Sequence, residues 1–159
     1  MAAEQSGISR GLGRIVSGLF VLTTGEGEQA TGMLASFVQQ AGFDPPAVTV
    51  AVKAGRPVVD TLRACRKFCI SILHDGSIGL LAHFAKGFEP GQPAFEGVAT
   101  ALGQNGVPYL TDAHAHVACV VIGEAEWGDH IVFCGEVVDG ERVDDDQPLT
   151  HVRRNGMSY

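Results

Sequence analysis

Residues 30–52 constrain the fold of this chain more than any other stretch. They read ATGMLASFVQQAGFDPPAVTVAV: an alternating apolar and polar segment, an Asp-Pro-Pro turn and a nearly continuous apolar segment. Alternation with a period of two is typical of a strand with one buried face, and proline-containing turns end strands. The stretch therefore predicts a strand that reaches about Gln39 and a second strand over Ala47–Lys53, buried on both faces. Its polar residues either belong to an ordinary strand pair or face a ligand.

Similar patterns elsewhere predict further strands joined by short turns. We expect these strands at Gly18–Gly25, Lys67–Leu73, Val98–Leu102, His114–Glu126 and His130–Asp139. Helices are expected within Ser6–Gly18, over Gly55–Cys65 with Pro57 in the first turn, and over Gly76–Gly87 with Ser77 as N-cap. Regular alternation of strand and helix is missing, so the expected fold class is mainly β: an antiparallel barrel with peripheral helices.

Length and charge limit the classes of protein that this chain can belong to. We expect residues 1–159 to form a single domain, because no linker, repeat or low-complexity segment divides them. The net charge is −7 and no basic cluster occurs beyond Arg153–Arg154, which argues against nucleic acids and anionic membranes as partners. No apolar run approaches the roughly 20 residues of a membrane span. The start of the chain lacks the apolar core of a secretory signal, so the expected location is the cytoplasm.

The cysteines favour structural roles. None of the four forms a C-x-x-C motif, and several lie within apolar patterns. They are expected to be small buried residues, with a zinc site or disulfides as the alternative. The cysteines are Cys65, Cys69, Cys119 and Cys134.

The histidines and the acidic run give no strong metal signature, and we predict no metal site. His114 and His116 form an H-x-H pair without an adjacent third ligand, so we expect exposed polar side chains. The run Asp144–Asp146 is expected to be a solvated turn. His83 lies between apolar helix residues and is expected to be packed and hydrogen-bonded.

Two segments remain unexplained by a purely structural reading. One is the stretch at residues 30–52. The other is GDHIVFCGEV at Gly128–Val137, in which His130 begins an apolar strand beside a turn, well placed to meet a ligand. Glycine-rich nucleotide loops of the Rossmann or P-loop type and the G-x-S-x-G hydrolase motif are absent from the sequence.

The sequence resembles the flavin reductase-like, FMN-binding split-barrel family over about Leu12 to Tyr159. The resemblance rests on the order and spacing of SGLFVLTTG, ATGMLASFVQQAGFDPPAVTVAVKAGRP, LLAHFAKG, GDHIVFCGEV and HVRRNG. The chain looks like a standalone relative of the flavin reductase modules that are fused to flavodiiron proteins. The resemblance implies a six-stranded antiparallel split barrel that forms a homodimer, with the flavin near the interface. The closing segment Thr150–Tyr159 is then expected to pack across that interface.

The resemblance also implies which residues bind the flavin. The expected contacts on the first strand are Thr31, Leu34, Ala35, Ser36, Phe37, Gln39 and Gln40. At the two glutamines many relatives have small hydroxyl residues, so contacts with the ring edge are expected there in place of the phosphate. Lys53 and Arg56 are expected to hold the phosphate, with Lys86 as a rival.

The implied activity is NAD(P)H-dependent reduction of FMN, with FAD as a further possibility. His130 would position the nicotinamide near the flavin, since hydride transfer needs stacked rings more than an acid or base. The reduced flavin would supply a monooxygenase, a metal centre or oxygen. The alternatives are an FMN-containing electron carrier, a non-enzymatic FMN-binding module, and a haem-binding relative with His83 or His130 as axial ligand. The sequence does not distinguish NADH from NADPH.

Overall fold

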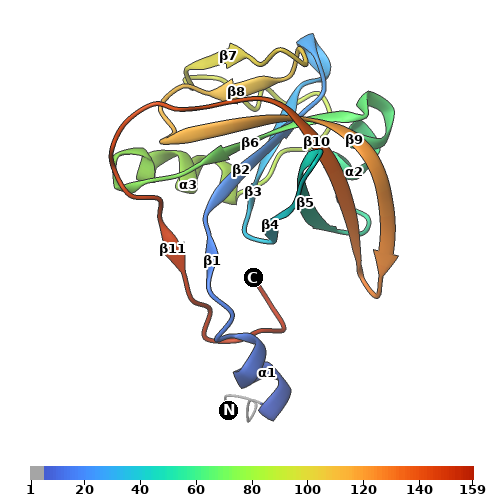
Figure 1. The fold of residues 1–159 in the computed structure, drawn as a ribbon, viewed down its shortest axis with the longest axis vertical. Helices are drawn as coiled ribbons and strands as arrows, with labels where there is room; N and C mark the ends of the chain where they lie inside the picture. Colours follow the sequence, from blue (N-terminus) through green and yellow to red (C-terminus); the bar gives the residue numbers. More distant parts are fainter. Residues whose placement is uncertain (1–5) are drawn as a thin grey trace.

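The computed structural model describes residues 6–159 as a curved antiparallel sheet with short helices around it, as Figure 1 shows. The strands are β1 (Ser17–Gly18), β2 (Phe20–Thr24), β3 (Thr31–Ala35), β4 (Val38–Phe43), β5 (Pro46–Lys53), β6 (Lys67–Ile72), β7 (Thr100–Leu102), β8 (Pro108–Leu110), β9 (Ala115–Trp127), β10 (His130–Arg142) and β11 (Thr150–His151). The helices are α1 (Gly7–Leu12), α2 (Pro57–Cys65) and α3 (Ile78–Ala85), with 3-10 turns η1 (Gly27–Gln29) and η2 (Asp75–Ser77). The mainly β class and the antiparallel pairing are confirmed.

The central sheet has seven strands in the order β3-β2-β6-β9-β10-β5-β4. Its two edge strands, β3 and β4, follow each other in the chain and are separated only by Ser36 and Phe37. Consecutive strands at opposite edges require the sheet to curl until its edges come together, which is the geometry of a split barrel. The single strand expected up to Gln39 is therefore two strands, and the sheet has seven strands where six were expected.

Most expected elements are present with small shifts of their ends. Pro57 is the first residue of α2, where its missing N–H costs nothing, and Gly87 follows α3 with φ +71°. Ser77 precedes α3 but does not cap it, because its hydroxyl donates to the carbonyl of His74. The short strands β1, β8 and β11 were not predicted, since two or three residues carry no periodic signal.

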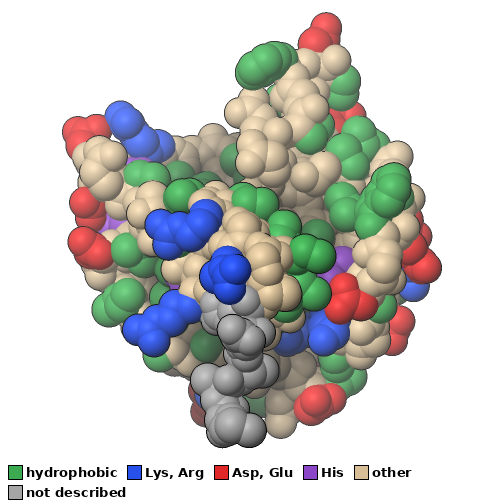
Figure 2. Space-filling view, turned by 90° about the horizontal axis from the view of Figure 1, so that it is seen from below, with side chains coloured by type: hydrophobic (Ala, Val, Ile, Leu, Met, Phe, Trp, Pro, Cys, Tyr) green, Lys and Arg blue, Asp and Glu red, His purple; other side chains and the backbone are tan. Residues whose placement is uncertain are grey.

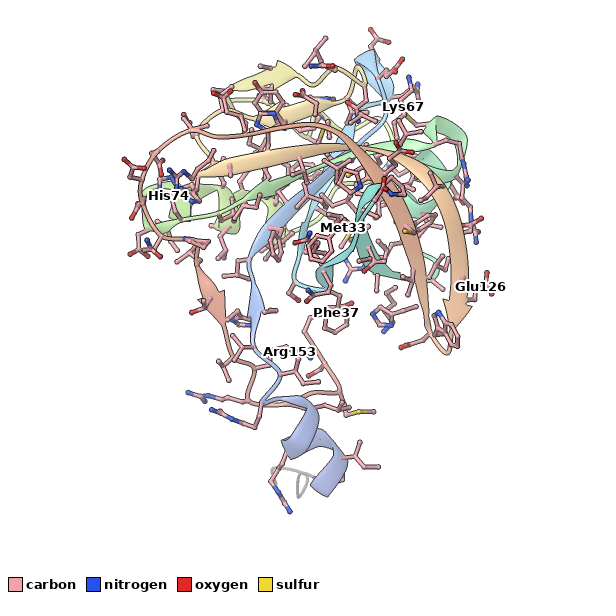
Figure 3. The ribbon with its side chains drawn as sticks, in the orientation of Figure 1. Met33, Phe37, Lys67, His74, Glu126 and Arg153 are labelled. Carbon is pink, nitrogen blue, oxygen red and sulfur yellow. The ribbon has the colours of Figure 1, made fainter. Side chains whose placement is uncertain are left out.

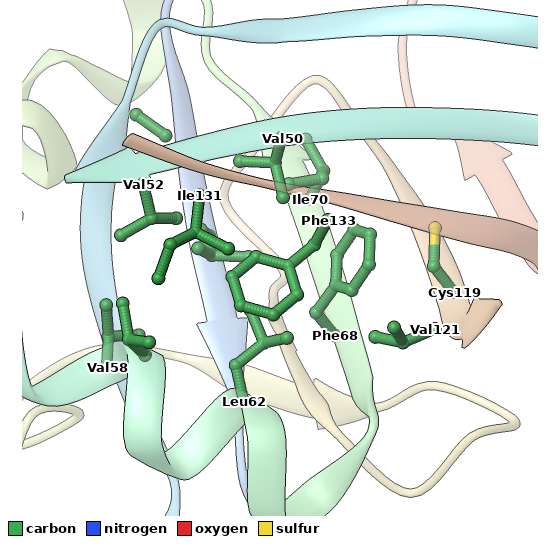
Figure 4. Packing of buried hydrophobic residues seen from close by; sticks show 13 residues of the cluster. Val50, Val52, Val58, Leu62, Phe68, Ile70, Cys119, Val121, Ile131 and Phe133 are labelled. Atoms are coloured by element: carbon green, nitrogen blue, oxygen red, sulfur yellow. The ribbon is translucent and has the colours of Figure 1, made fainter. Parts of the chain in front are cut away.

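The main core fills the barrel and is closed at one end by α2, whose apolar face contributes Val58 and Leu62 (Figure 4). Phe68 and Phe133 are fully buried in it. Gly135 is required here, since an added Cβ would lie 2.6 Å from the ring of Phe68. Burial of this apolar area is the main force that holds the sheet closed.

The second strand of residues 30–52 is not buried on both faces as expected. In β5, Val50 and Val52 lie in the core and Val48 packs against it, but Thr49 and Ala51 on the opposite face are only partly buried. The face with Thr49 and Ala51 lines a groove of about 830 Å³ between the barrel and an extension of the chain. The apolar run thus reflects one core face and one groove face.

The extension is the arm, which consists of the chain from α1 through β1, together with β11 and the residues after β11, and projects from the barrel in Figure 1. Its parts are joined by the β1–β11 pairing and by a hydrogen bond from the Ser9 hydroxyl to Oδ1 of Asn155, 2.6 Å long. Ile15 and Val16 of the arm are 62% and 61% exposed. Figure 2 views the molecule from the side of the arm and shows hydrophobic side chains next to arginine and lysine side chains on this face.

The expectation of exposed histidines at positions 114 and 116 is wrong. Both are buried: His116 stacks on Tyr109 with ring centroids 3.6 Å apart, and His114 Nδ1 lies 2.5 Å from Asp144. The acidic turn at Asp144–Asp146 is therefore not merely solvated, because Asp144 also lies within ion-pair distance of His74. Among residues 6–159, no group of three or more metal-ligating side chains is arranged to hold a metal ion.

The cysteines are free thiols in the described part of the chain, two of them buried and two partly buried. Burial raises the pKa of Cys69 and of Cys119 to about 12, so both stay protonated and inert, as expected for small core residues. His83 is packed and hydrogen-bonded as predicted, with Nε2 2.7 Å from the Ala94 carbonyl oxygen. No helix within residues 6–159 is long and apolar enough to span a membrane.

Candidate functional site

A cavity of about 250 Å³ opens beside β3, and polar side chains from several elements line it. Thr31 begins β3, Arg56 immediately precedes α2, and Lys86 immediately follows α3. Gly32 allows α3 to pack closely here, because a Cβ at this position would lie 2.9 Å from the ring of Phe84. Two cations and a hydroxyl line this cavity beside one carboxylate, that of Glu89, and are a donor set suited to a phosphate group.

A second cavity, of about 260 Å³, adjoins the first, and both are lined by Met33 and Arg56. Its lining is mostly apolar, with one wall from β3 and the residue after it, one from α3 and one from the chain at and after β11. The apolar side is formed by the first two walls. These lining residues are Leu34, Ala35, Ser36, Leu81, Phe84 and Ala85. The two cavities form one groove, here called the flavin groove, with a cationic end and an apolar end.

An aromatic cluster stands beside the apolar end. The ring of Phe37 lies 5.5 Å from the rings of both His130 and Tyr159, measured between centroids. The Arg153 guanidinium lies 4.7 Å from the Phe37 centroid, and that of Arg56 lies 5.8 Å from the Tyr159 centroid. In Figure 3, Met33, Phe37 and Arg153 follow one another from the sheet toward the arm. The cluster therefore joins the barrel, the β9–β10 hairpin and the arm.

Hydrogen bonds fix His130 on both sides. Nδ1 lies 2.7 Å from Asp129 Oδ1, and Nε2 is hydrogen-bonded to the hydroxyl of Tyr159. The bond to His130 lowers the pKa of Asp129, while burial raises the pKa of Tyr159. With Asp129 ionised, Nδ1 of His130 donates a hydrogen bond to its carboxylate, and Nε2 is left facing the hydroxyl of Tyr159.

The donor set of the flavin groove fits a flavin mononucleotide. Its cationic end matches a phosphate dianion, and its apolar end matches the faces of the isoalloxazine ring. On an acidic protein such a local concentration of positive charge also attracts anions selectively. Arg56 lies between the two ends, since it lines both cavities.

The structure brings together most of the residues expected at the site. Thr31, Arg56 and Lys86 share the cationic end, Leu34, Ala35 and Ser36 share the apolar end, and Phe37 contacts His130.

Three expected residues lie elsewhere. Gln39 and Gln40 are exposed on β4 and line the groove beside the arm. Lys53 is exposed at the end of β5, paired with His130 in the sheet, and lines neither cavity of the flavin groove. Lys86, expected as the rival, is thus the cation that stands with Arg56.

Sequence reasoning missed Met33, Asp129, Arg153 and Tyr159 as site residues. Met33 belongs to the same alternating strand as Thr31, and Asp129 is the neighbour of His130, so local signals existed for both. Arg153 and Tyr159 carry no local signal, because the fold of the arm alone brings them to Phe37. Leu81 and Phe84, three residues apart on α3, follow a helical period that marks one face.

Comparisons with known proteins agree with this geometry. The model of the family described as "Flavin reductase like domain" matches residues 12–158. Putative diflavin flavoprotein A 6 from Nostoc sp. is 40% identical over 154 residues, which are 96% of this chain. The chain spans only 27% of the length of that relative.

Solved structures with the same fold cover nearly the whole chain. NADH:FAD oxidoreductase SgcE6 from Streptomyces globisporus aligns with a TM-score of 0.85 and 28% identity, over 96% of this chain and 94% of that one. The styrene monooxygenase flavin reductase from Pseudomonas putida S12 aligns with a TM-score of 0.79 and 25% identity, over 94% of each chain. With a family model that matches almost the entire sequence and a barrel shared with these structures, this chain belongs to the flavin reductase-like domain family.

Proposed function

We propose that this domain is an NAD(P)H-dependent FMN reductase. The observation that carries the proposal is the flavin groove, in which Arg56 and Lys86 offer a phosphate site and the strand residues Leu34–Ser36 offer an apolar wall. His130 and Phe37 stand beside the apolar end, where a second planar reactant could approach the ring. Membership of a flavin reductase-like family supports the same reading.

When bound, a flavin would supply the redox chemistry, as acceptor of a hydride from nicotinamide and as donor of electrons to a further partner. The residues of this chain bind and orient. Arg56 and Lys86 hold the anionic end, β3 and α3 exclude water from the ring, and His130 positions the donor through Nε2. No side chain needs to act as acid or base, so the site requires no catalytic triad.

FMN is favoured over FAD because the flavin groove has one compact cationic end. Glu89 lines that cavity together with Arg56 and Lys86, so two cations share the cavity with one carboxylate, which suits one phosphate group better than two. One of the solved relatives is named for FAD, so a direct comparison of FMN and FAD affinities is needed to test the preference.

We further propose a redox protein partner in the cytoplasm. One solved relative is the flavin reductase of a styrene monooxygenase, and the curated relative is a longer protein named as a diflavin flavoprotein. A monooxygenase or another flavin-dependent protein is therefore the proposed acceptor of electrons from this domain.

The proposed assembly is a homodimer. The apolar groove between arm and barrel and the exposed side chains of Ile15 and Val16 would be covered by a second copy. Sedimentation analysis should give a dimer for the unchanged protein and a shift toward monomer for Val16→Asp. The control is Ile122→Asp, an exposed position that does not line the groove, which should remain dimeric. A monomeric unchanged protein would contradict the proposal.

The test of the proposed activity is anaerobic mixing of FMN-loaded protein with NADH and, separately, with NADPH while flavin absorbance is followed. Rapid bleaching with either donor is expected and names the donor. A protein that holds FMN and is reduced by dithionite, but is bleached by neither nicotinamide, would instead be an electron carrier or a binding module.

A further inference from the structure

The chain after β11 turns back from the arm and places Tyr159 against the barrel. Its ring lies 5.5 Å from that of Phe37 and 5.9 Å from that of His130, and its hydroxyl is hydrogen-bonded to His130 Nε2. Tyr159 also lines the apolar cavity of the flavin groove together with Arg153 and His151. These three residues form the one wall of that cavity that comes from the arm and not from the barrel or α3.

Tyr159 stands at the mouth of the groove and not at its floor. The residue is 63% exposed, whereas Ala35 and Phe84 on the opposite walls are 8% and 1% exposed. A flavin ring held between β3 and α3 would therefore leave Tyr159 on its accessible side. A hydride donor must reach that side and stack with its reacting carbon about 3–3.5 Å from the ring.

We propose that Tyr159 is a displaceable cover of the donor site, whose ring holds the place that the nicotinamide must take beside Phe37 and His130. This inference rests on the proposed function, because it names the residue that regulates entry to that site. Nicotinamide binding then requires the Tyr159 ring to leave, so the apparent affinity for the donor is reduced by the fraction of molecules in which the cover is closed.

The contacts that hold the cover are suited to release. The rings of Tyr159 and Phe37 are tilted by 44° and do not stack, and the guanidinium of Arg56 is 5.8 Å from the Tyr159 centroid. Only one hydrogen bond, to His130, joins Tyr159 to the barrel through its side chain among the interactions of residues 6–159. The same Nε2 becomes available to the donor when Tyr159 leaves, so the cover also masks the group that would position the nicotinamide.

The experiment is a titration of FMN-loaded protein with NAD⁺, which binds the donor site without reducing the flavin, followed by the change in flavin absorbance. Tyr159→Ala should bind NAD⁺ about tenfold more tightly than the unchanged protein, because no cover has to be displaced. Tyr159→Phe, which keeps the ring and loses the hydrogen bond, should show a smaller gain. FMN affinity is measured in parallel by titrating the flavin-free proteins, so that a change in NAD⁺ binding is separated from a change in flavin binding.

Met157→Ala is the matched control, since Met157 lies two residues away in the same segment and is 68% exposed. Its NAD⁺ affinity should equal that of the unchanged protein, which separates loss of the cover from loosening of the segment. Equal or weaker NAD⁺ binding by Tyr159→Ala would overturn the inference. So would a loss of FMN affinity in Tyr159→Ala, which would make Tyr159 a flavin contact.

The failure of this inference differs from failure of the proposed function. If the unchanged protein is bleached by a nicotinamide and the Tyr159 variants bind NAD⁺ no more tightly, only the cover is refuted. If the unchanged protein resists bleaching and Tyr159→Ala is bleached, the result supports a Tyr159 ring that blocks the donor site in the unchanged protein. If neither is bleached and neither binds NAD⁺, both the reductase activity and the cover are refuted.

Discussion

Asp129 Oδ1 lies 2.7 Å from Nδ1 of its neighbour His130 and leaves the opposite nitrogen of the imidazole facing the hydroxyl of Tyr159, a residue that lines the flavin groove. The carboxylate is held in its ionised form, because the hydrogen bond to His130 lowers the pKa of Asp129. The orientation of His130 should therefore persist throughout the neutral pH range.

Replacing Asp129 by Ala should slow NAD(P)H-driven flavin reduction about tenfold, since a misplaced positioning group costs rate even without acid–base chemistry. FMN affinity should not change, because Asp129 lines neither cavity of the flavin groove. Stopped-flow reduction and flavin titration measure the two effects separately. Glu126→Ala, in the same hairpin but paired with Arg63, is the control and should reduce at the normal rate. Equal rates for both variants would remove Asp129 from the positioning role.

The cationic end of the flavin groove can be tested with three variants. Arg56→Ala and Lys86→Ala should each weaken FMN binding about tenfold or more, because a charge-assisted contact to the phosphate is lost. Lys53→Ala should leave the affinity nearly unchanged, since its side chain lies outside the groove. Fluorescence titration of the flavin-free proteins gives the three dissociation constants. A larger loss for Lys53 than for Lys86 would restore Lys53 as a phosphate ligand.

Gly135 offers a test of core packing. An added Cβ would lie 2.6 Å from the Phe68 ring and 2.7 Å from the Cβ of Cys119, so Gly135→Ala should destabilise the fold by about 1–3 kcal/mol. Gly123→Ala is the control, because a Cβ there would meet no atom within 4 Å. Denaturant unfolding of the two variants measures the difference. Comparable stabilities would mean that the core at Phe68 adapts more readily than its packing indicates.

The pairing of His74 with the acidic turn should make stability depend on pH. Nδ1 lies 2.7 Å from Asp146, and this bond raises the pKa of His74 above 6.5. The stabilisation is complete below pH 6.5, where His74 is protonated in both states, and is lost as pH rises through the folded-state pKa. The pKa of Asp146 is lowered from 3.8, mainly by the same bond, so the stabilisation also declines below that pH.

Unfolding of the unchanged protein and of His74→Gln at several pH values tests this window. The advantage of the unchanged protein should be largest at about pH 4–6.5 and should shrink toward pH 8. Asp146→Asn should behave like His74→Gln, because it removes the other partner. A difference between the unchanged protein and His74→Gln that is constant with pH would show that the pair does not couple protonation to folding.

The sequence was informative where structure is periodic or stereochemically marked. Alternation identified β3, a nearly continuous apolar run identified β5, and the position of Pro57 identified the start of α2. The sequence at Ser36 and Phe37 did not predict the end of β3, because neither residue is a typical strand breaker. The chain leaves the strand there because the sheet closes between β3 and β4.

Side-chain environments were harder to predict than elements. His116 reads as a polar residue on a strand, but it is buried and stacked on Tyr109, which its sequence neighbours do not indicate. Tyr159 could not be placed at all from its neighbours, since its partners are distant in the chain and are reached only through the arm. For the candidate site, the resemblance to a family supplied what periodicity could not, and the structure then separated Lys86 from Lys53.

Ser36 and Phe37 connect β3 to β4, the two edge strands of the seven-stranded sheet. This short connection holds the two edges of the sheet together. A ligand that contacts Leu34–Ser36 would therefore contact this connection directly. Binding of the ligand would then stabilise the closed sheet. At a ligand concentration of 100 times the dissociation constant, binding would add about 2.7 kcal/mol to the stability of the folded protein. In such a domain the flavin is a structural component as well as a carrier of electrons, so the flavin-free protein should unfold more readily than the flavin-bound protein.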